Sequence, residues 1–385
     1  MQLDPSDPAA LLDPVATYAA ARADSPVARM PVPGLGKSGL GTLWIVTRHE
    51  HARAVLTDPR FRLSRASYAM RPAGLPDTAN LGELDGPDHT RLRRLVSPAF
   101  TARRAAEFRP RIEQIARALG ERLPAEFDLL TDFAWPLPIE VICELVGIAE
   151  ADRPLWRRAG VAVASGQGQA FQEAIPEVIA GAKAAVARRR AEPGDDLLGD
   201  LVRTEASDED LVVLCWHLVL AGQVPGNLIA NAVEALLDHP EQLQLLRDDP
   251  SLMPRAVEEL LRWCTPQLLT TPRFTTEDLE IGGVPIPKGE PVSVSMLSAN
   301  RDPEAFPDPD HLDLTRTPGS LGHLAFAHGP HFCLGAALAR VETEVALTTL
   351  ITLFPRLRLA GNPVRSPDPG TWRLAALPIR VDAGE

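Results

Sequence analysis

The segment AFAHGPHFCLGAALAR, residues Ala325 to Arg340, decides how the rest of the chain is interpreted. Cys333 ends a loop that holds glycine, proline and histidine, and an apolar helical pattern begins directly after it. Free backbone N–H groups and the positive end of a helix dipole favour a thiolate at such a position. Gly329 and Gly335 carry no side chain, which lets a flat and bulky group approach the backbone. From these residues alone, a thiolate ligand and an ordinary buried cysteine at a helix start are equally good interpretations.

Length, composition and charge narrow the class of protein. The chain has 385 residues, of which 45% are hydrophobic and 23% charged, as in ordinary globular proteins. Its formal net charge of −12 argues against nucleic acid as a partner. No signal peptide and no continuous run of about 18 apolar residues is present, so we expect a cytoplasmic protein without a membrane span. The cysteines form no CxxC pair, which argues against a zinc site or a disulfide framework; they are Cys143, Cys215, Cys264 and Cys333.

Hydrophobic spacing predicts a mainly α fold with a small β region, in one domain that spans residues 1–385. The segment TLWIVTR, Thr42 to Arg48, reads as a strand. Helical spacing runs from His89 to about Val202, and short strands with turns are expected from Thr271 to Val294. A last long helix is predicted from about Leu334.

One central helix is expected from Ser207 to about Asp238. It opens on SDED, a capping-box pattern, and is apolar on nearly every side, so it should be buried. At 1.5 Å per residue its roughly 30 residues span about 45 Å. Pro225, with Gly222 and Gly226 around it, lies inside this helix. Since an interior proline costs about 3 kcal/mol or more, its presence calls for a reason.

The opening segment resembles the haem-binding signature FxxGxHxCxG of the cytochrome P450 superfamily. The signature positions are filled in register by Phe326, Gly329, His331, Cys333 and Gly335. Ala327 stands where the family usually has glycine. The resemblance implies the P450 fold, haem b as cofactor and Cys333 as the thiolate ligand of its iron, which favours O–O cleavage.

Three further segments match the family in the expected chain order. EELLR supplies an ExxR pair, Glu259 and Arg262, which lie on one helix face and would form a buried structural lock. The usual third partner of that pair falls at His311, where many relatives have arginine. The resemblance covers essentially the whole chain and is closest to the soluble bacterial enzymes.

The same resemblance implies how the haem propionates would be held. His89 and Arg93 lie four residues apart on one helix face and would bind one propionate. Arg273 and His331 would supply the remaining contacts.

The central helix resembles the family's distal helix, which crosses the haem and carries the pattern A-G-x-[D/E]-T. Ala221 and Gly222 keep the first two positions, but Val224 replaces the acid and Pro225 replaces the threonine. Neither replacement can relay a proton. The proline ring pushes away the Ala221 carbonyl, so it can open the distal groove without the threonine.

The proton would then have to come from another source. The candidates are ordered water, a hydroxyl or amine of the substrate, and the side-chain amides of Gln223 and Asn227, which are four apart and share a face.

Other candidates follow from position in the family alone. For the substrate pocket they are Ser67 to Met70, Val161 to Gln169, Leu268 to Thr270, and Thr371 with Trp372. Packing is as good an explanation for each. A basic cluster, which is either a docking face for an acidic ferredoxin or a solvated helix face, comprises Arg91, Arg94, Arg103 and Arg104.

Three functions are compatible with these motifs. The first is a haem-thiolate monooxygenase that oxidises a small organic molecule with electrons from ferredoxin and ferredoxin reductase; a carrier protein that presents the substrate is a further candidate partner. The second is a P450 enzyme that couples, cyclises or rearranges its substrate without net oxygen insertion. The third is a haem protein without catalytic activity. The Ala/Arg/Pro-rich composition is typical of GC-rich bacterial genomes, where such enzymes often serve secondary metabolism.

Overall fold

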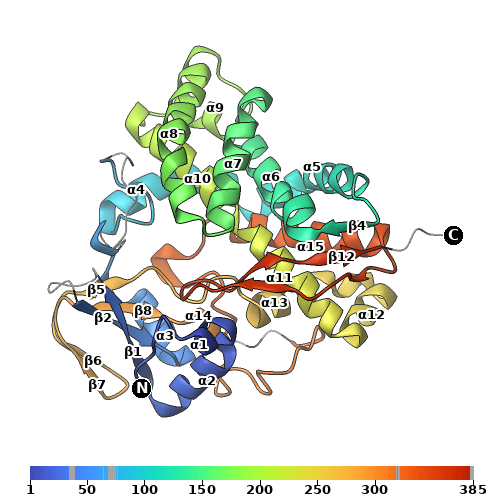
Figure 1. Cartoon of the computed structure of the whole chain (residues 1–385). Coiled ribbons are helices and arrows are strands. Elements are labelled where there is room, and N and C mark those ends of the chain that lie inside the picture. Colours follow the sequence, from blue (N-terminus) through green and yellow to red (C-terminus); the bar gives the residue numbers. More distant parts are fainter. Residues whose placement is uncertain are drawn as a thin grey trace.

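A computed structural model describes residues 1–33, 40–63, 65–67, 75, 77–317, 319 and 321–381. The fold is mainly helical with a small β region, as predicted (Figure 1). The described helices are α1 (Pro8–Leu12), α2 (Pro14–Asp24), α3 (His49–Thr57), α4 (Gly86–Val96), α5 (Ala102–Gly120), α6 (Pro136–Val146), α7 (Arg153–Ala164), α8 (Gly168–Ala191), α9 (Leu197–Val202), α10 (Asp208–Ala221), α11 (Val224–Asp238), α12 (Pro240–Asp248), α13 (Met253–Trp263), α14 (Met296–Asn300) and α15 (Ala336–Leu353).

The β region lies mainly beside the N-terminal helices, at the lower left of Figure 1. Its five-stranded sheet has the order β1-β2-β8-β5-β3, in which β2 and β8 are parallel and the other neighbours antiparallel. The predicted strand TLWIVTR is β2. The described strands are β1 (Val27–Pro33), β2 (Leu40–Val46), β3 (Phe61–Arg62), β4 (Glu126–Asp128), β5 (Arg273–Thr275), β6 (Leu279–Ile281), β7 (Val284–Ile286), β8 (Pro291–Val294), β9 (Arg358–Leu359), β10 (Val364–Ser366), β11 (Arg373–Ala376) and β12 (Pro378–Arg380).

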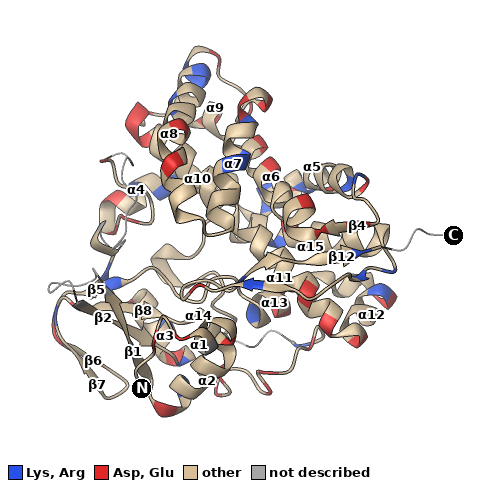
Figure 2. Ribbon diagram, viewed as in Figure 1, with Lys and Arg blue, Asp and Glu red and all other residues tan. Residues whose placement is uncertain are grey.

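The helical core is built around α10, α11 and α15. Most residues of α10 and α11 are buried, as the apolar pattern predicts. Charged residues gather on the outer helices, whereas the ribbon through the centre is mostly uncharged (Figure 2). The predicted capping box is confirmed in part, since the Ser207 hydroxyl accepts a hydrogen bond from the Asp210 N–H at 3.1 Å.

The predicted central helix is two helices. The helix is interrupted at Gly222 and Gln223, so the prediction of one continuous helix was wrong. Gln223 N–H bonds the Leu220 carbonyl at 3.3 Å, three residues back instead of four. Pro225 falls in the first turn of α11, where its missing N–H would have no intrahelical partner. The break therefore removes most of the penalty that an interior proline carries.

Taken through this break, Asp208–Asp238 is long and apolar enough to cross a membrane by length and composition. The sequence expectation counted only unbroken apolar runs and missed this segment. In the structure, 78% of its most apolar 18-residue stretch is buried inside the protein, as in a core helix.

Candidate active site

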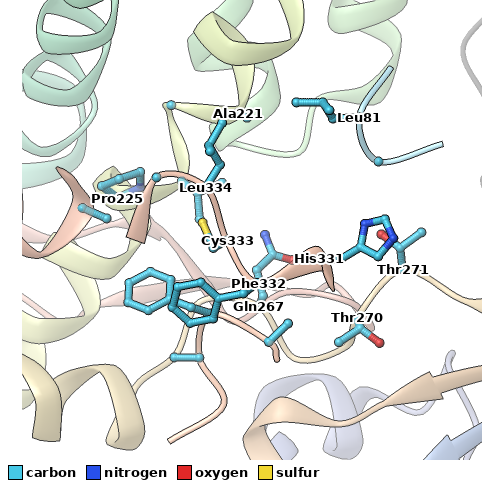
Figure 3. Close-up of a pocket in the computed structure, with 18 of the residues that line it drawn as sticks. Leu81, Ala221, Pro225, Gln267, Thr270, Thr271, His331, Phe332, Cys333 and Leu334 are labelled. Atoms are coloured by element: carbon cyan, nitrogen blue, oxygen red, sulfur yellow. The ribbon is translucent and has the colours of Figure 1, made fainter. Parts of the chain in front are cut away.

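Cys333 lies where the loop before α15 passes under the break between α10 and α11. The Cys333 N–H donates to the Phe326 carbonyl at 3.0 Å, which closes the loop, and α15 begins three residues later. Figure 3 shows the Cys333 side chain below Ala221, with Pro225 on one side and His331 on the other. Cys333 is accessible and lines a cavity of about 540 Å³, whereas the other three cysteines are buried. The cysteine that the motif selects is thus the one that faces a cavity.

The surroundings of the Cys333 thiol have opposing effects on its pKa. Burial raises the pKa of the Cys333 thiol, while the Gly335 N–H and the charges of Arg93 and Arg340 lower it. Burial has the larger effect, so the helix start alone does not produce the thiolate that the sequence analysis expected. Binding of a metal ion at the sulfur would supply the missing stabilisation.

The two signature glycines serve different purposes. At Gly335 a Cβ atom would meet nothing within 4 Å, so the backbone borders open cavity space. Gly329 has φ +76°, and a Cβ there would lie 2.6 Å from the Leu56 carbonyl oxygen. Gly329 thus lets the loop pack against α3, and Gly335 leaves room for a flat group. Ala327, at the usual glycine position, adopts φ 57° and bears the strain that glycine avoids.

The four predicted propionate contacts converge on the same cavity. His89, Arg93, Arg273 and His331 all line it. The His89 and His331 rings lie 4.1 Å apart between centroids at an interplanar angle of 34°, and His331 Nε2 lies 3.2 Å from an Asp85 carboxylate oxygen. Four basic side chains from three separate parts of the chain therefore line one cavity.

This basic group lacks enough negative charge of its own. Burial and the charges of His331 and Arg93 lower the pKa of His89 to about 4. Burial also lowers the pKa of Arg273, whose Nε atom is buried without a hydrogen-bond partner. A bound anion would relieve both, so the arrangement fits the carboxylates of haem.

The cavity roof is formed by the ends of α10 and α11. Ala221, Gly222, Val224 and Pro225 all line the cavity, as the resemblance predicts. None of these side chains can donate a proton to a bound molecule.

The structure places the two candidate amides outside the described cavity lining. The Gln223 side chain donates to the Val219 carbonyl at 3.3 Å. Asn227 accepts from Trp135 Nε1 and donates to the Ala164 carbonyl, both at 3.2 Å. These bonds hold the helix break and its neighbours together. Neither amide lines the cavity, where a proton source for a bound molecule would have to lie.

The ExxR pair forms a buried lock. Arg262 makes two hydrogen bonds to the Glu259 carboxylate, of 2.7 and 2.8 Å, and both side chains are only 2% exposed. The third charged partner is Arg316, whose Nε lies 3.1 Å from a Glu259 oxygen. His311 contributes its backbone carbonyl to both arginines, so the prediction that its side chain completes the group was wrong. Arg316 lies five residues later, and its charge was the signal available in the sequence.

Two titratable cavity residues were missed by the sequence analysis. Glu342 in α15 is 1% exposed, and its Oε2 atom has no hydrogen-bond partner. It is the one carboxylic acid among the described residues that line the cavity. His217 in α10 is the second. His217 is a single polar residue in an apolar run, whereas Glu342 lies among the polar residues Arg340, Thr343 and Glu344, so its sequence did not distinguish it.

The remaining candidates separate clearly. Of the predicted pocket segments, only Leu269 and Thr270 line the cavity; residues 68–70 of the first lie outside the described residues. In the basic cluster, Arg91 pairs with Asp210, and Arg103 and Arg104 pair with Glu107.

Comparison with known proteins agrees with this geometry. The family model named Cytochrome P450 matches residues 234–379. The cytochrome P450 monooxygenase PikC of Streptomyces venezuelae is 41% identical, over 97% of this chain and 92% of its own. A solved structure of P450BioI, in complex with an acyl carrier protein ligated to hexadec-9Z-enoic acid, has a similar fold. Its TM-score is 0.87 and its identity 31%, over 97% of this chain and 100% of that chain. The structure of CxnD, the P450 for C–S bond formation in chuangxinmycin biosynthesis, has a TM-score of 0.86 and 36% identity, covering 96% and 95%.

The fold, the cavity-facing cysteine and these relatives define a haem-thiolate oxidoreductase of the monooxygenase class. The chain belongs to the cytochrome P450 family. Its cofactor is haem, with a cysteine thiolate as the iron ligand.

Proposed function

We propose that this enzyme inserts one oxygen atom into a small organic molecule of bacterial secondary metabolism. The observation that carries the proposal is the accessible Cys333 thiol, which faces one cavity together with the basic group His89, Arg93, Arg273 and His331. The similarity to PikC and to CxnD supports it, since one is a P450 monooxygenase and the other is a P450 of chuangxinmycin biosynthesis.

The chain's own residues divide the work as follows. Cys333 would ligate the iron, and Gly335 would leave space for the macrocycle. Arg93, Arg273 and the two histidines would bind the propionates by charge-assisted hydrogen bonds. When bound, haem supplies the redox chemistry that activates oxygen. The apolar side chains of the roof would pack against the substrate.

Protons must reach the reaction without the usual acid and threonine. Val224 and Pro225 line the roof but carry no exchangeable proton. We therefore place the proton supply on ordered water, on a hydroxyl or amine of the substrate, and on Glu342. Burial raises the pKa of Glu342 well above its usual range, which favours the protonated carboxyl beside the cavity.

A second activity is supported by a specific observation. The missing acid and threonine weaken the usual proton delivery, and CxnD, similar over 96% of this chain, forms a C–S bond. Oxidative coupling, cyclisation or rearrangement without net oxygen insertion is therefore the alternative outcome at the same site.

The proposed partners are ferredoxin and ferredoxin reductase in the cytoplasm. Arg94, which is exposed in α4, would contribute to an acidic ferredoxin's docking site. Because P450BioI binds an acyl carrier protein, a carrier-bound substrate is a further possibility to test.

The first experiment is the reduced carbon monoxide spectrum of the haem-loaded enzyme. A band at the thiolate position, lost in Cys333→Ala but kept in the control Cys264→Ala, is the expected result. Candidate substrates that shift the Soret band are then tested for turnover with a ferredoxin system. A product heavier by one oxygen atom supports insertion, loss of two hydrogens or dimerisation supports the alternative, and no turnover with any candidate contradicts both.

The proton supply is tested with Val224→Asp combined with Pro225→Thr. If substrate or water delivers protons efficiently, this variant gains little coupled turnover with the native substrate. A large gain would contradict the proposed supply.

A further inference from the structure

His217 is the one polar side chain that the described part of the distal helices presents to the cavity. It lies in α10 four residues before Ala221, so the two share a helix face. The other residues of α10 and α11 that line the cavity carry no polar side chain; they are Leu218, Ala221, Gly222, Val224, Pro225 and Leu228. Among the described residues, this roof therefore offers a ligand one polar side chain, while Gln267, Thr270 and Thr271 line the cavity elsewhere.

The His217 ring has no hydrogen-bond partner among the described residues. Among the described residues, its close ring neighbour is Trp216, at 5.8 Å between centroids in an edge-to-face arrangement of 84°. Burial lowers the pKa of His217 to about 4, although the nearby Glu83 acts in the other direction. The imidazole is therefore neutral at physiological pH and offers one N–H donor and one nitrogen acceptor.

An unsatisfied polar group in the apolar roof of the cavity favours ligands that can form a hydrogen bond with it. Leaving such a group unpaired costs free energy, and a site built around it discriminates against analogues that lack the matching group. An anion is a poor match, because the apolar side chains around His217 in the roof disfavour charge.

We propose that His217 is a substrate-binding residue that selects neutral molecules carrying a hydroxyl, keto or amide group on an otherwise apolar framework. This inference rests on the proposed function, because it assigns the substrate class of that same site. His217 acts in binding and takes no part in bond cleavage.

The test measures binding to the haem-loaded enzyme by calorimetry. The probes are tetralin, a tetralol with its hydroxyl on the saturated ring, and a tetralin carboxylate with its carboxylate on that ring. The variants are His217→Phe, which keeps a ring without nitrogen, and His217→Gln, which keeps a donor and an acceptor. The wild type should bind tetralol about 3- to 10-fold tighter than tetralin, the contribution of one hydrogen bond. His217→Phe should lose this preference, and His217→Gln should retain part of it.

A second measurement is independent of affinity. In the diamagnetic ferrous carbon monoxide form, the ring nitrogen resonances of isotope-labelled His217, assigned by their loss in His217→Phe, should move when tetralol is added and stay with tetralin.

Three results would overturn the inference: no preference for tetralol in the wild type, the same preference in His217→Phe, or tightest binding of the carboxylate. Each is distinct from failure of the proposed function. That failure shows as a missing thiolate band in the wild-type carbon monoxide spectrum, which is recorded for every variant before binding is measured.

Discussion

At the scale of single residues, Gly329 shows why the haem loop needs glycine at one signature position. Its φ of +76° and the Leu56 carbonyl, 2.6 Å from a Cβ placed there, both exclude a side chain. The contact is to backbone, which cannot rotate away. The same carbonyl accepts a hydrogen bond of 2.9 Å from Arg273, so the loop and one of the proposed propionate-binding residues share a partner.

We expect Gly329→Ala to destabilise the protein by about 3 kcal/mol or more, because left-handed strain of about 1–2 kcal/mol adds to a steric clash. The matched control is Gly283→Ala, which has φ +84° but meets nothing within 4 Å. Urea unfolding of the haem-loaded proteins measures both. Equal losses in the two variants would show that the Leu56 contact contributes nothing.

Single residues also show what sequence can and cannot predict. Cys333, His89 and Arg93 were predicted from the resemblance to the P450 motifs, and the structure places all three at the cavity. Glu342 and His217 were not predicted, because neither belongs to the motifs that carry the resemblance. Which face of a helix borders a cavity depends on packing between distant segments, and one sequence does not contain that information in readable form.

At the scale of elements, close contacts with neighbouring segments fix the break between α10 and α11. A Cβ at Gly222 would lie 2.7 Å from Ile142 in α6, and one at Gly226 would lie 2.6 Å from the Ala134 carbonyl. Helical periodicity predicted burial correctly but could not predict the break. The deciding contacts are the side-chain bond from Gln223 to Val219 and the close approach of α6, which are properties of the folded state.

We therefore expect the two unusual residues of the break to respond differently to alanine. Gly222→Ala should cost about 1–3 kcal/mol, since it overpacks against a β-branched side chain. Pro225→Ala should change stability by less than about 1 kcal/mol, because a first-turn proline sacrifices no helical hydrogen bond. Gly168→Ala, at the start of α8 with nothing within 4 Å of its Cβ, is the control for helix propensity. A loss at Pro225 as large as at Gly222 would contradict this account.

At the scale of the whole molecule, the Glu259–Arg262 pair joins distant segments. Arg262 donates to the carbonyls of Asn300 and Pro309 at 3.0 and 2.7 Å, and Glu259 accepts from the Asp313 N–H at 3.1 Å. Helix α13 is thereby tied to the irregular segment that leads to the cysteine loop. The sequence predicted the pair and its burial, whereas its third member depended on how that irregular segment folds.

Removing one partner should be costly, because it leaves a buried charge unpaired. We expect Glu259→Ala to lower the free energy of unfolding by about 3–5 kcal/mol. The control is Glu177→Ala, which breaks the surface pair with Arg158, whose side chains are 65% and 66% exposed; that loss should stay below about 1 kcal/mol. Comparable losses of unfolding free energy in the two variants would mean that the buried pair stabilises the protein no more than an exposed pair does.

Glu342 makes the stability of the whole molecule depend on pH in the unusual direction. Burial raises its pKa well above the ordinary 4.5, so the folded state keeps a proton that the unfolded state releases. Stability should therefore be full below about pH 4.5 and fall as pH rises toward the raised pKa, by up to about 1.4 kcal/mol per pH unit.

Glu342→Gln removes this dependence and should stabilise the protein at neutral pH, increasingly so from pH 5 to pH 7, as measured by urea unfolding of the haem-loaded enzyme. Glu205→Gln, at an exposed position, should leave the pH profile unchanged. Parallel profiles for wild type and Glu342→Gln would mean that the carboxyl ionises in the folded state, and Glu342 would then hold no proton for the reaction at neutral pH.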